Sequence, residues 1–126
     1  KAARNFLLHR SSDIKGIILS EVLLDLLEGV NKDVSKGRRN EALSMILSIT
    51  MSIMSHVLRS SGKDMTDDME LRDIIKVLTE GNLIERAMIA RLRSIESIRM
   101  KTNSRDPTDE EIELAIENVQ VLIGLL

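Results

Sequence analysis

Apolar residues recur at intervals of three and four positions along most of the chain, which is the spacing of one face of an α-helix. The first run covers residues 12–28 and is followed by Gly29. Because glycine readily adopts the backbone conformations that terminate helices, we expect the first helix to end there. Residues 1–10 precede this run, and we expect them to form either a short docking helix, with Phe6 and Leu7 on the core, or a loose terminus.

A second helix is predicted over residues 38–60, after a polar connector at 31–40 and before Gly62. Its middle, residues 42–58, is apolar on nearly every side, which is typical of the central helix of a bundle or of a membrane span. Four serines form one narrow stripe of small residues along it: Ser44, Ser48, Ser52 and Ser55. Because the segment is short and interrupted by hydroxyls, we predict a central helix with a neighbour packed closely on the stripe, and no membrane span.

Helix-start signals predict further helices in the second half of the chain. A third helix opens at Thr66 or Asp67, with Glu70 at capping-box spacing from Asp67, and ends at Gly81. Asn82 is then expected to cap a fourth helix, because asparagine is among the residues preferred at that position. The apolar spacing carries this fourth helix to about residue 101.

The fifth helix has the clearest start in the chain. Pro107 and Thr108 precede three acidic residues, and Glu111 takes the third helical position. Thr108 and Glu111 therefore have the spacing of a capping box, and the acids lie where the helix dipole favours negative charge. Together these patterns predict an all-α fold, a compact bundle of about five helices with a central apolar helix, in a single domain covering residues 1–126.

Composition narrows the classes of function. Hydrophobic residues make up 43% of the 126 residues and charged residues 30%, a balance typical of ordered globular proteins. Cysteine is absent and Phe6 is the only aromatic residue, which excludes disulfides, thiolate chemistry and aromatic platforms that stack bases or sugars. The lack of cysteine suits a reducing compartment, and we expect an intracellular protein, either cytoplasmic or nuclear.

Catalysis and metal binding find little support in the residue patterns. The two histidines are His9, near the N-terminus, and His56, which lies within the apolar helix and is interpreted as a hydrogen-bonded or rim residue. Acidic residues gather at 64–73 and 109–117, but both groups lie at predicted helix starts, where carboxylates are favoured in any case. We therefore predict a non-enzymatic protein with no catalytic residue, no metal site and no cofactor.

The C-terminal segment is unusually apolar for the end of a chain. Its apolar residues are Val121, Leu122, Ile123, Leu125 and Leu126. They must be covered by the domain itself, by a partner, or by residues outside this sequence. Seven methionines, whose side chains adapt to irregular contacts, also favour an interface. Our leading hypothesis is a self-association or protein-docking domain, part of a longer regulatory protein, with these five C-terminal residues in the interface.

Basic residues favour an alternative function, the binding of RNA or DNA. They concentrate in the connector at 32–39 and along the fourth helix: Lys36, Arg38, Arg39, Arg86, Arg91, Arg93, Arg99 and Lys101. Arg86 and Arg93 are seven positions apart, so they share a helix face on which phosphates can bind. The competing interpretation of the same residues is the solvated face of an amphipathic helix.

Overall fold

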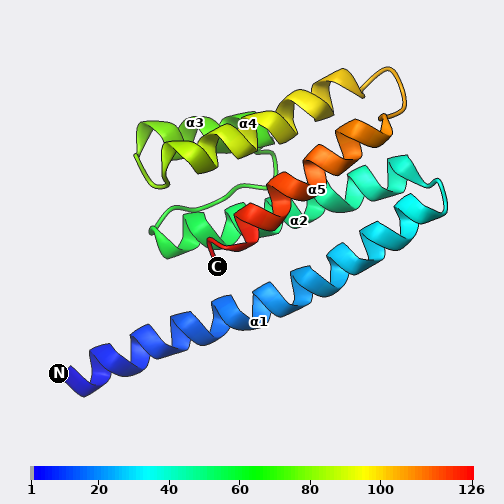
Figure 1. Cartoon of the computed structure of the whole chain (residues 1–126). Helices are drawn as coiled ribbons and strands as arrows, with labels where there is room; N and C mark the ends of the chain where they lie inside the picture. The colour runs from blue at the N-terminus through cyan, green and yellow to red at the C-terminus, as the bar shows by residue number, and fades with distance from the viewer. Residues whose placement is uncertain (1) are drawn as a thin grey trace.

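The computed structural model is a stack of α-helices joined by short connections (Figure 1). It describes the backbone of residues 2–126 and the side chains of residues 16–126. The helices are α1 (Ala2–Ser35), α2 (Arg39–Ser60), α3 (Leu71–Glu80), α4 (Arg86–Lys101) and α5 (Asp109–Ile123). No strand occurs between residues 2 and 126, so the predicted all-α bundle is confirmed.

Helix α2 lies at the centre of the bundle, as its sequence predicts. It packs against α1, α3 and α5, while α5 also contacts α4, and α3 pairs with α4 (Figure 1). Isoleucines from successive turns of α2 are buried, because neighbours cover the helix on several sides: Ile46, Ile49 and Ile53. Thr50 is buried among them, and its hydroxyl donates a hydrogen bond of 2.8 Å to the carbonyl of Ile46. The only buried hydroxyl in this region therefore has a partner within its own helix.

The end of the first helix was predicted wrongly at Gly29. Helix α1 continues through this glycine to Ser35, and Gly37, with a φ of +75°, follows its end. The N–H of Arg38 bonds the carbonyl of Asp33 at 2.8 Å, which closes the last turn. Helix α1 passes Gly29 because the next residue, Val30, is completely buried, and burial of its side chain outweighs the poor helix propensity of one glycine. The side chains of Phe6, Leu7 and His9 lie outside the described residues.

Replacing Gly29 with alanine is expected to stabilise the domain. Nothing lies within 4 Å of the position that a Cβ on Gly29 would take, and its φ is not positive. Alanine there should raise the free energy of unfolding by about 0.5–1 kcal/mol, since it restricts the unfolded chain and favours the helix. The measurement is urea denaturation of dilute protein followed by circular dichroism.

Gly16 provides the matched control on the same helix. A Cβ on Gly16 would lie 2.6 Å from the backbone carbonyl oxygen of Leu126, closer than two such atoms can approach. Gly16→Ala must therefore displace the C-terminal residues. The free-energy cost of that displacement offsets the gain in helix propensity that alanine brings at either position. If both variants changed stability equally, the contact between Gly16 and Leu126 would be contradicted.

The predicted starts of α3 and α4 were wrong by a few residues. Helix α3 begins at Leu71, and the N–H of Glu70 donates to the carboxylate of Asp73 at 3.0 Å, so the first residue of the cap is Glu70 and not Asp67. Asn82 does not cap α4, which starts at Arg86 after Glu85. Asn82 instead has a φ of +52° in the turn between α3 and α4, a left-handed conformation that asparagine tolerates better than most residues.

The capping box of α5 is confirmed. The Thr108 hydroxyl accepts the N–H of Glu111 at 3.1 Å, and the Glu111 carboxylate accepts the N–H of Thr108 at 3.0 Å. Arg105 adds two hydrogen bonds to the same carboxylate, at 2.7 and 2.9 Å. Hydrogen bonding from Arg105, followed by that from Thr108, lowers the pKa of Glu111 from 4.5 to about 2.

This pKa predicts acid sensitivity of the α5 start. The Glu111 carboxyl titrates near 4.5 in the unfolded chain and near 2 in the folded domain. The folded state thus binds this proton less readily, so its contribution to stability is full above pH 4.5 and is lost as the pH falls toward 2. In urea titrations across this range, the free energy of unfolding of Glu111→Gln should depend less on pH than that of the wild type. Glu113→Gln, at an exposed position of the same helix, is the control and should keep the wild-type dependence.

Candidate interaction surface

The domain itself covers the apolar C-terminal segment. Leu122 and Ile123 are buried in the core, Leu125 and Leu126 are half-buried against it, and Val121 is half-buried. The close approach of Leu126 to Gly16 brings the end of the chain onto α1. In this fold Leu122 and Ile123 offer no surface to a partner, and the apolar character of the segment is explained by contacts within the chain.

Helix α1 carries apolar side chains that its neighbours leave uncovered. Leu23, Leu27 and Val30 face the core and are buried. Five other large apolar residues of the same helix are between 38 and 56% exposed: Ile17, Ile18, Val22, Leu24 and Leu26. Elsewhere in residues 16–126, large apolar side chains are exposed only singly, at Met100 on α4 and Leu114 on α5. The uncovered apolar surface is therefore concentrated on one helix, and single exposed residues elsewhere need no explanation.

Helical spacing divides the exposed residues of α1 into two edges. Ile18, Val22 and Leu26 follow one another at intervals of four and form a continuous ridge, which we call the α1 ridge. Ile17 and Leu24 are seven positions apart and lie along the opposite edge. The α1 ridge is the longer row, and two carboxylates flank it, Glu21 one turn from Ile18 and Asp25 one turn from Val22.

The sequence identifies these side chains only as part of the apolar run of the first predicted helix. Spacing of three and four marks a helix with an apolar face, but α1 is apolar on several sides, and the pattern cannot show how many of those sides find a neighbour. One signal was available: the segment 17–27 is too densely apolar for one buried stripe. That density indicates an additional contact, but it does not show which of the side chains take part in it.

The serine stripe of α2 is not covered by a helix, so the prediction of a closely packed neighbour there was wrong. Ser44, Ser48 and Ser52 are exposed, and Ser55 is half-buried. The core-facing side of α2 is instead formed by its Ile, Leu and Met side chains, because these gain more from burial than serine does. The serines are the solvent-facing side of an otherwise buried helix.

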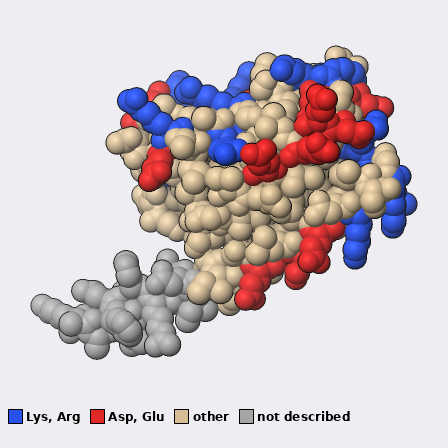
Figure 2. All heavy atoms as spheres, in the orientation of Figure 1, with Lys and Arg blue, Asp and Glu red and all other residues tan. Residues whose placement is uncertain are grey.

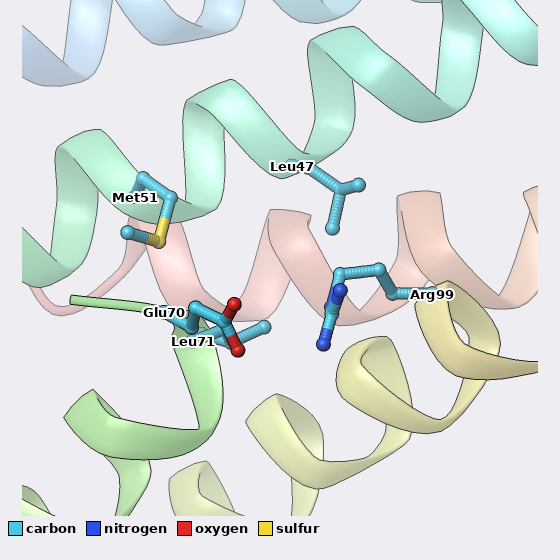
Figure 3. A pocket seen from close by; sticks show the side chains of 5 residues that line it. All are labelled: Leu47, Met51, Glu70, Leu71 and Arg99. Atoms are coloured by element: carbon cyan, nitrogen blue, oxygen red, sulfur yellow. The ribbon is translucent and has the colours of Figure 1, made fainter. Parts of the chain in front are cut away.

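A small hollow opens between α2 and the start of α3 (Figure 3). Its volume is about 160 Å³, and its lining consists of Leu47 and Met51 from α2, Glu70 and Leu71 at the start of α3, and Arg99 from α4. The charged groups are already engaged: Arg99 forms hydrogen bonds of 2.7 and 2.9 Å to Glu96, and Glu70 lies 3.2 Å from Arg72. The hollow thus provides an apolar floor with neutralised charges at its rim.

The basic residues do not form a single stripe. Arg39, Arg91 and Arg99 pair within the domain: Arg39 with Asp109 at 2.6 Å, Arg91 with Glu117 at 3.5 Å, and Arg99 with Glu96. Lys36 and Arg38 lie at the turn between α1 and α2, whereas Arg86 begins α4 at the other end of the bundle (Figure 1). Lys101 ends α4, far along the helix from Arg86. In Figure 2, basic and acidic side chains are interspersed along the upper part and the border of the visible face, around a broad uncharged area.

Two of the predicted arginines do lie together. Arg86 and Arg93 line a hollow of about 400 Å³ with Thr79, Ile89 and Ala90, between α3 and α4. Arg86 and Arg93 are exposed, and no carboxylate from the described side chains lies within 4 Å of either guanidinium. Lys36, Arg38 and Lys101 are exposed as well and form no ion pair with the described side chains, but they do not line this hollow.

The remaining chemical candidates contribute to local structure. Within residues 16–126 no three acidic or histidine side chains converge as metal ligands would. The acidic groups instead occupy the starts of α3 and α5, and His56 is half-buried on α2 near Gly16. Helix α2 is long and apolar enough to cross a membrane, but half of its most apolar window is buried in the domain, as in the core helix of a soluble protein.

The chain matches no protein-family model, and no curated protein or solved structure is similar to it. Evidence for a function therefore comes from the surface of the domain alone.

Proposed function

We propose that this chain is a non-enzymatic helical interaction domain that associates with a second copy of itself through the exposed apolar face of α1. The observation that carries the proposal is the concentration of five exposed large apolar side chains on that one helix. A row of neighbouring exposed apolar side chains, such as the α1 ridge, is a usual mark of a protein contact. An intracellular location, inside a longer regulatory protein, belongs to the same proposal.

Burial of the α1 ridge provides a driving force of the right size. Each of its three side chains is about half exposed, so covering the remainder contributes about 1 kcal/mol per side chain. Six such side chains in a symmetric pair contribute about 6 kcal/mol, to which the rest of the contact adds. Because association itself costs about 4 kcal/mol or more, the ridge alone leaves about 2 kcal/mol, and together with the rest of the contact we expect a weak dimer that is populated near millimolar concentration.

The charges along α1 support a second copy as the partner. Residues 1–15 contain four basic residues and one acidic residue, whereas residues 16–31 contain three acidic residues and no basic one. A helix with opposite charges in its two halves is complementary to an antiparallel copy of itself.

Sedimentation equilibrium with interference optics tests this function directly, since the chain lacks Trp and Tyr and absorbs little near 280 nm. The wild type should show a reversible dimer whose population rises with concentration. Val22→Asp should be monomeric at the same concentrations and keep the wild-type helical circular dichroism, because it places a charge on the α1 ridge without touching the core.

Leu114→Asp is the matched control, since Leu114 is similarly exposed but lies on α5. It should dimerise as the wild type does. A wild type that is monomeric up to millimolar concentration, or a Val22→Asp variant that dimerises normally, would overturn the proposal.

Nucleic-acid binding is a second candidate, favoured by the exposed Arg86 and Arg93 in the hollow between α3 and α4. It is weaker because three of the eight predicted basic residues pair with acidic residues of the domain. Fluorescence anisotropy with labelled RNA and DNA decides it: binding should weaken steeply with salt and be lost in Arg86→Ala/Arg93→Ala. Absent or salt-insensitive binding would eliminate this candidate.

A further inference from the structure

We infer that the hollow between α3 and α4 is a binding site for a phosphate monoester, and that Arg86 and Arg93 hold its phosphate group. The site lies on other helices than the exposed apolar face of α1, so the inference is independent of the proposed self-association. It involves the same two arginines as the nucleic-acid candidate, but a single phosphate group on a small organic molecule is enough to occupy it.

Arg86 and Arg93 flank the hollow on one face of α4. With Ile89 and Ala90 they occupy positions i, i+3, i+4 and i+7, which lie on one side of a helix. Seven residues separate the two arginines by about 10 Å along the helix axis. Ala90 lies between them and is exposed, and its small side chain leaves the space above it open. A ligand placed over Ala90 is therefore approached by a long cationic side chain from each end.

Among the described side chains, no acid balances these two charges. The exposed residues of α4 are basic, small or apolar: Arg86, Ala87, Ala90, Arg93, Ser97, Met100 and Lys101. The only acid of this helix, Glu96, is buried and bonded to Arg99. Glu80 and Glu85, at the end of α3 and just before α4, do not line the hollow, and neither carboxylate lies within 4 Å of the two guanidinium groups. The charges that border the hollow are thus positive.

Two guanidinium groups match a phosphate monoester better than a carboxylate. A phosphate monoester carries a charge of about −1.5 to −2 at pH 7 and has three acceptor oxygens. Each guanidinium can donate a pair of parallel hydrogen bonds to such a group. A carboxylate carries a single charge and two oxygens, so one arginine already satisfies it. The presence of two unpaired arginines therefore favours a phosphate group.

The size and the floor of the hollow favour a phosphate that is carried by an organic molecule. The volume of about 400 Å³ falls in the range of pockets that hold small molecules, about 300–1,000 Å³. Ile89 and Ala90 provide an apolar surface for the body of the ligand. The Thr79 hydroxyl donates to the carbonyl of Ile75 at 2.7 Å, so its oxygen is left to accept a hydrogen bond from a ligand hydroxyl. A sugar phosphate combines these features.

A small phosphorylated molecule fits the hollow better than a nucleic-acid strand does. No aromatic side chain lines the hollow, so a base finds no ring on which to stack. Helix α5, which packs against α4, has no basic residue and exposes four acids: Asp109, Glu110, Glu113 and Glu117. A strand that continued from the hollow across α4 would approach these carboxylates, and like charges at close range disfavour binding. A single phosphate group between α3 and α4 avoids them.

Nuclear magnetic resonance of the isotope-labelled full-length chain, titrated with ribose 5-phosphate, tests the site. We expect saturable shifts of the backbone amides around the hollow, between residues 79 and 93, with a dissociation constant of about 1 mM. Ribose without phosphate should give no saturable shift at the same concentrations. Shifts that do not saturate, or that are equally large at the exposed Lys36, Arg38 and Lys101, would show general ion screening and overturn the inference.

Substitutions in the hollow distinguish a defined site from diffuse charge. Arg93→Gln should weaken the binding of ribose 5-phosphate about tenfold, and Arg93→Lys should weaken it less, since lysine keeps the charge but not the paired hydrogen bonds. Ala90→Glu, at an exposed position, should abolish binding because its carboxylate occupies the space between the arginines.

Lys101→Gln is the matched control, because it removes one charge from an exposed position of the same helix outside the hollow. It should bind ribose 5-phosphate as the wild type does. Equal losses of affinity in Lys101→Gln and Arg93→Gln would contradict a site in the hollow.

A short single-stranded RNA without a terminal phosphate separates the two sources of phosphate, since its internal phosphates are diesters with a single charge each. Tighter binding of ribose 5-phosphate than of this RNA, at equal concentrations of phosphate groups, would support the inference. Binding of the RNA without binding of ribose 5-phosphate would overturn it and support the nucleic-acid candidate. A wild type that is monomeric by sedimentation removes only the proposed dimer, so the two failures are distinguishable.

Discussion

Leu122→Ala is expected to lower the free energy of unfolding by about 3 kcal/mol, the largest single effect that we predict. Leu122 was a candidate for the partner interface on sequence grounds, but its side chain is completely buried between α5 and the rest of the core. Removing three buried carbon atoms loses the free energy gained by transferring them from water into the core. It also leaves a cavity that the surrounding helices fill only in part. The variant should therefore unfold at much lower urea without any change in the concentration dependence of dimer formation.

Leu114 on the same helix is the matched control, because its side chain is 43% exposed. Leu114→Ala should cost less than about 1 kcal/mol, since it vacates little buried volume. Equal losses of stability in the two variants would contradict the orientation of α5. A Leu122→Ala variant that kept full stability but no longer dimerised would instead support the hypothesis that the C-terminal segment forms the interface.

Arg99→Met is expected to lower the free energy of unfolding by about 2 kcal/mol. The Glu96 side chain is only 10% exposed, and both of its carboxylate oxygens accept hydrogen bonds from Arg99. The same hydrogen bonds raise the pKa of Arg99. Without Arg99 the carboxylate is left in a poorly hydrated position, and the expected cost is less than for a fully buried pair because the Arg99 side chain is 37% exposed.

The double variant Glu96→Leu/Arg99→Met separates this explanation from a loss of packing. Replacing both partners leaves no unpaired charge, so stability should return to within about 1 kcal/mol of the wild type. Arg93→Met, at an exposed position of the same helix, should be nearly neutral. Thermal denaturation of the four proteins provides the measurement. A double variant as unstable as Arg99→Met would show that the ion pair is not the cause.

Local sequence signals predicted the helices well where the responsible contacts are local. The Thr108–Glu111 capping box depends on residues three positions apart, and it is present where expected. The central position of α2 also follows from its own composition, since a helix apolar on most sides needs several neighbours. At Gly29, by contrast, the local stop signal was overridden, because burial of Val30 against other helices contributes more than one glycine costs.

The candidate sites were less predictable, since they depend on which surfaces remain exposed to solvent after the helices have packed. The eight basic residues are visible in the sequence, but the acidic partners of Arg39 and Arg91 come from α5, far away along the chain. The apolar C-terminal segment and the apolar α1 segment look alike as sequences. Only one of them is covered in the fold, because the C-terminal residues pack into the core while α1 stands at the edge of the bundle (Figure 1).

The sequence by itself therefore determined the helical class, the central helix and the strongest helix start, because these follow from composition, spacing and contacts within one turn. The tertiary structure alone decided which apolar faces are covered, which arginines are paired and where the serines point. The spacing of apolar residues along a helix indicates which side chains gain from burial, but it does not indicate which neighbouring element buries them. At the exposed α1 ridge no neighbour within the described residues does so, and that is where we propose that a second copy binds.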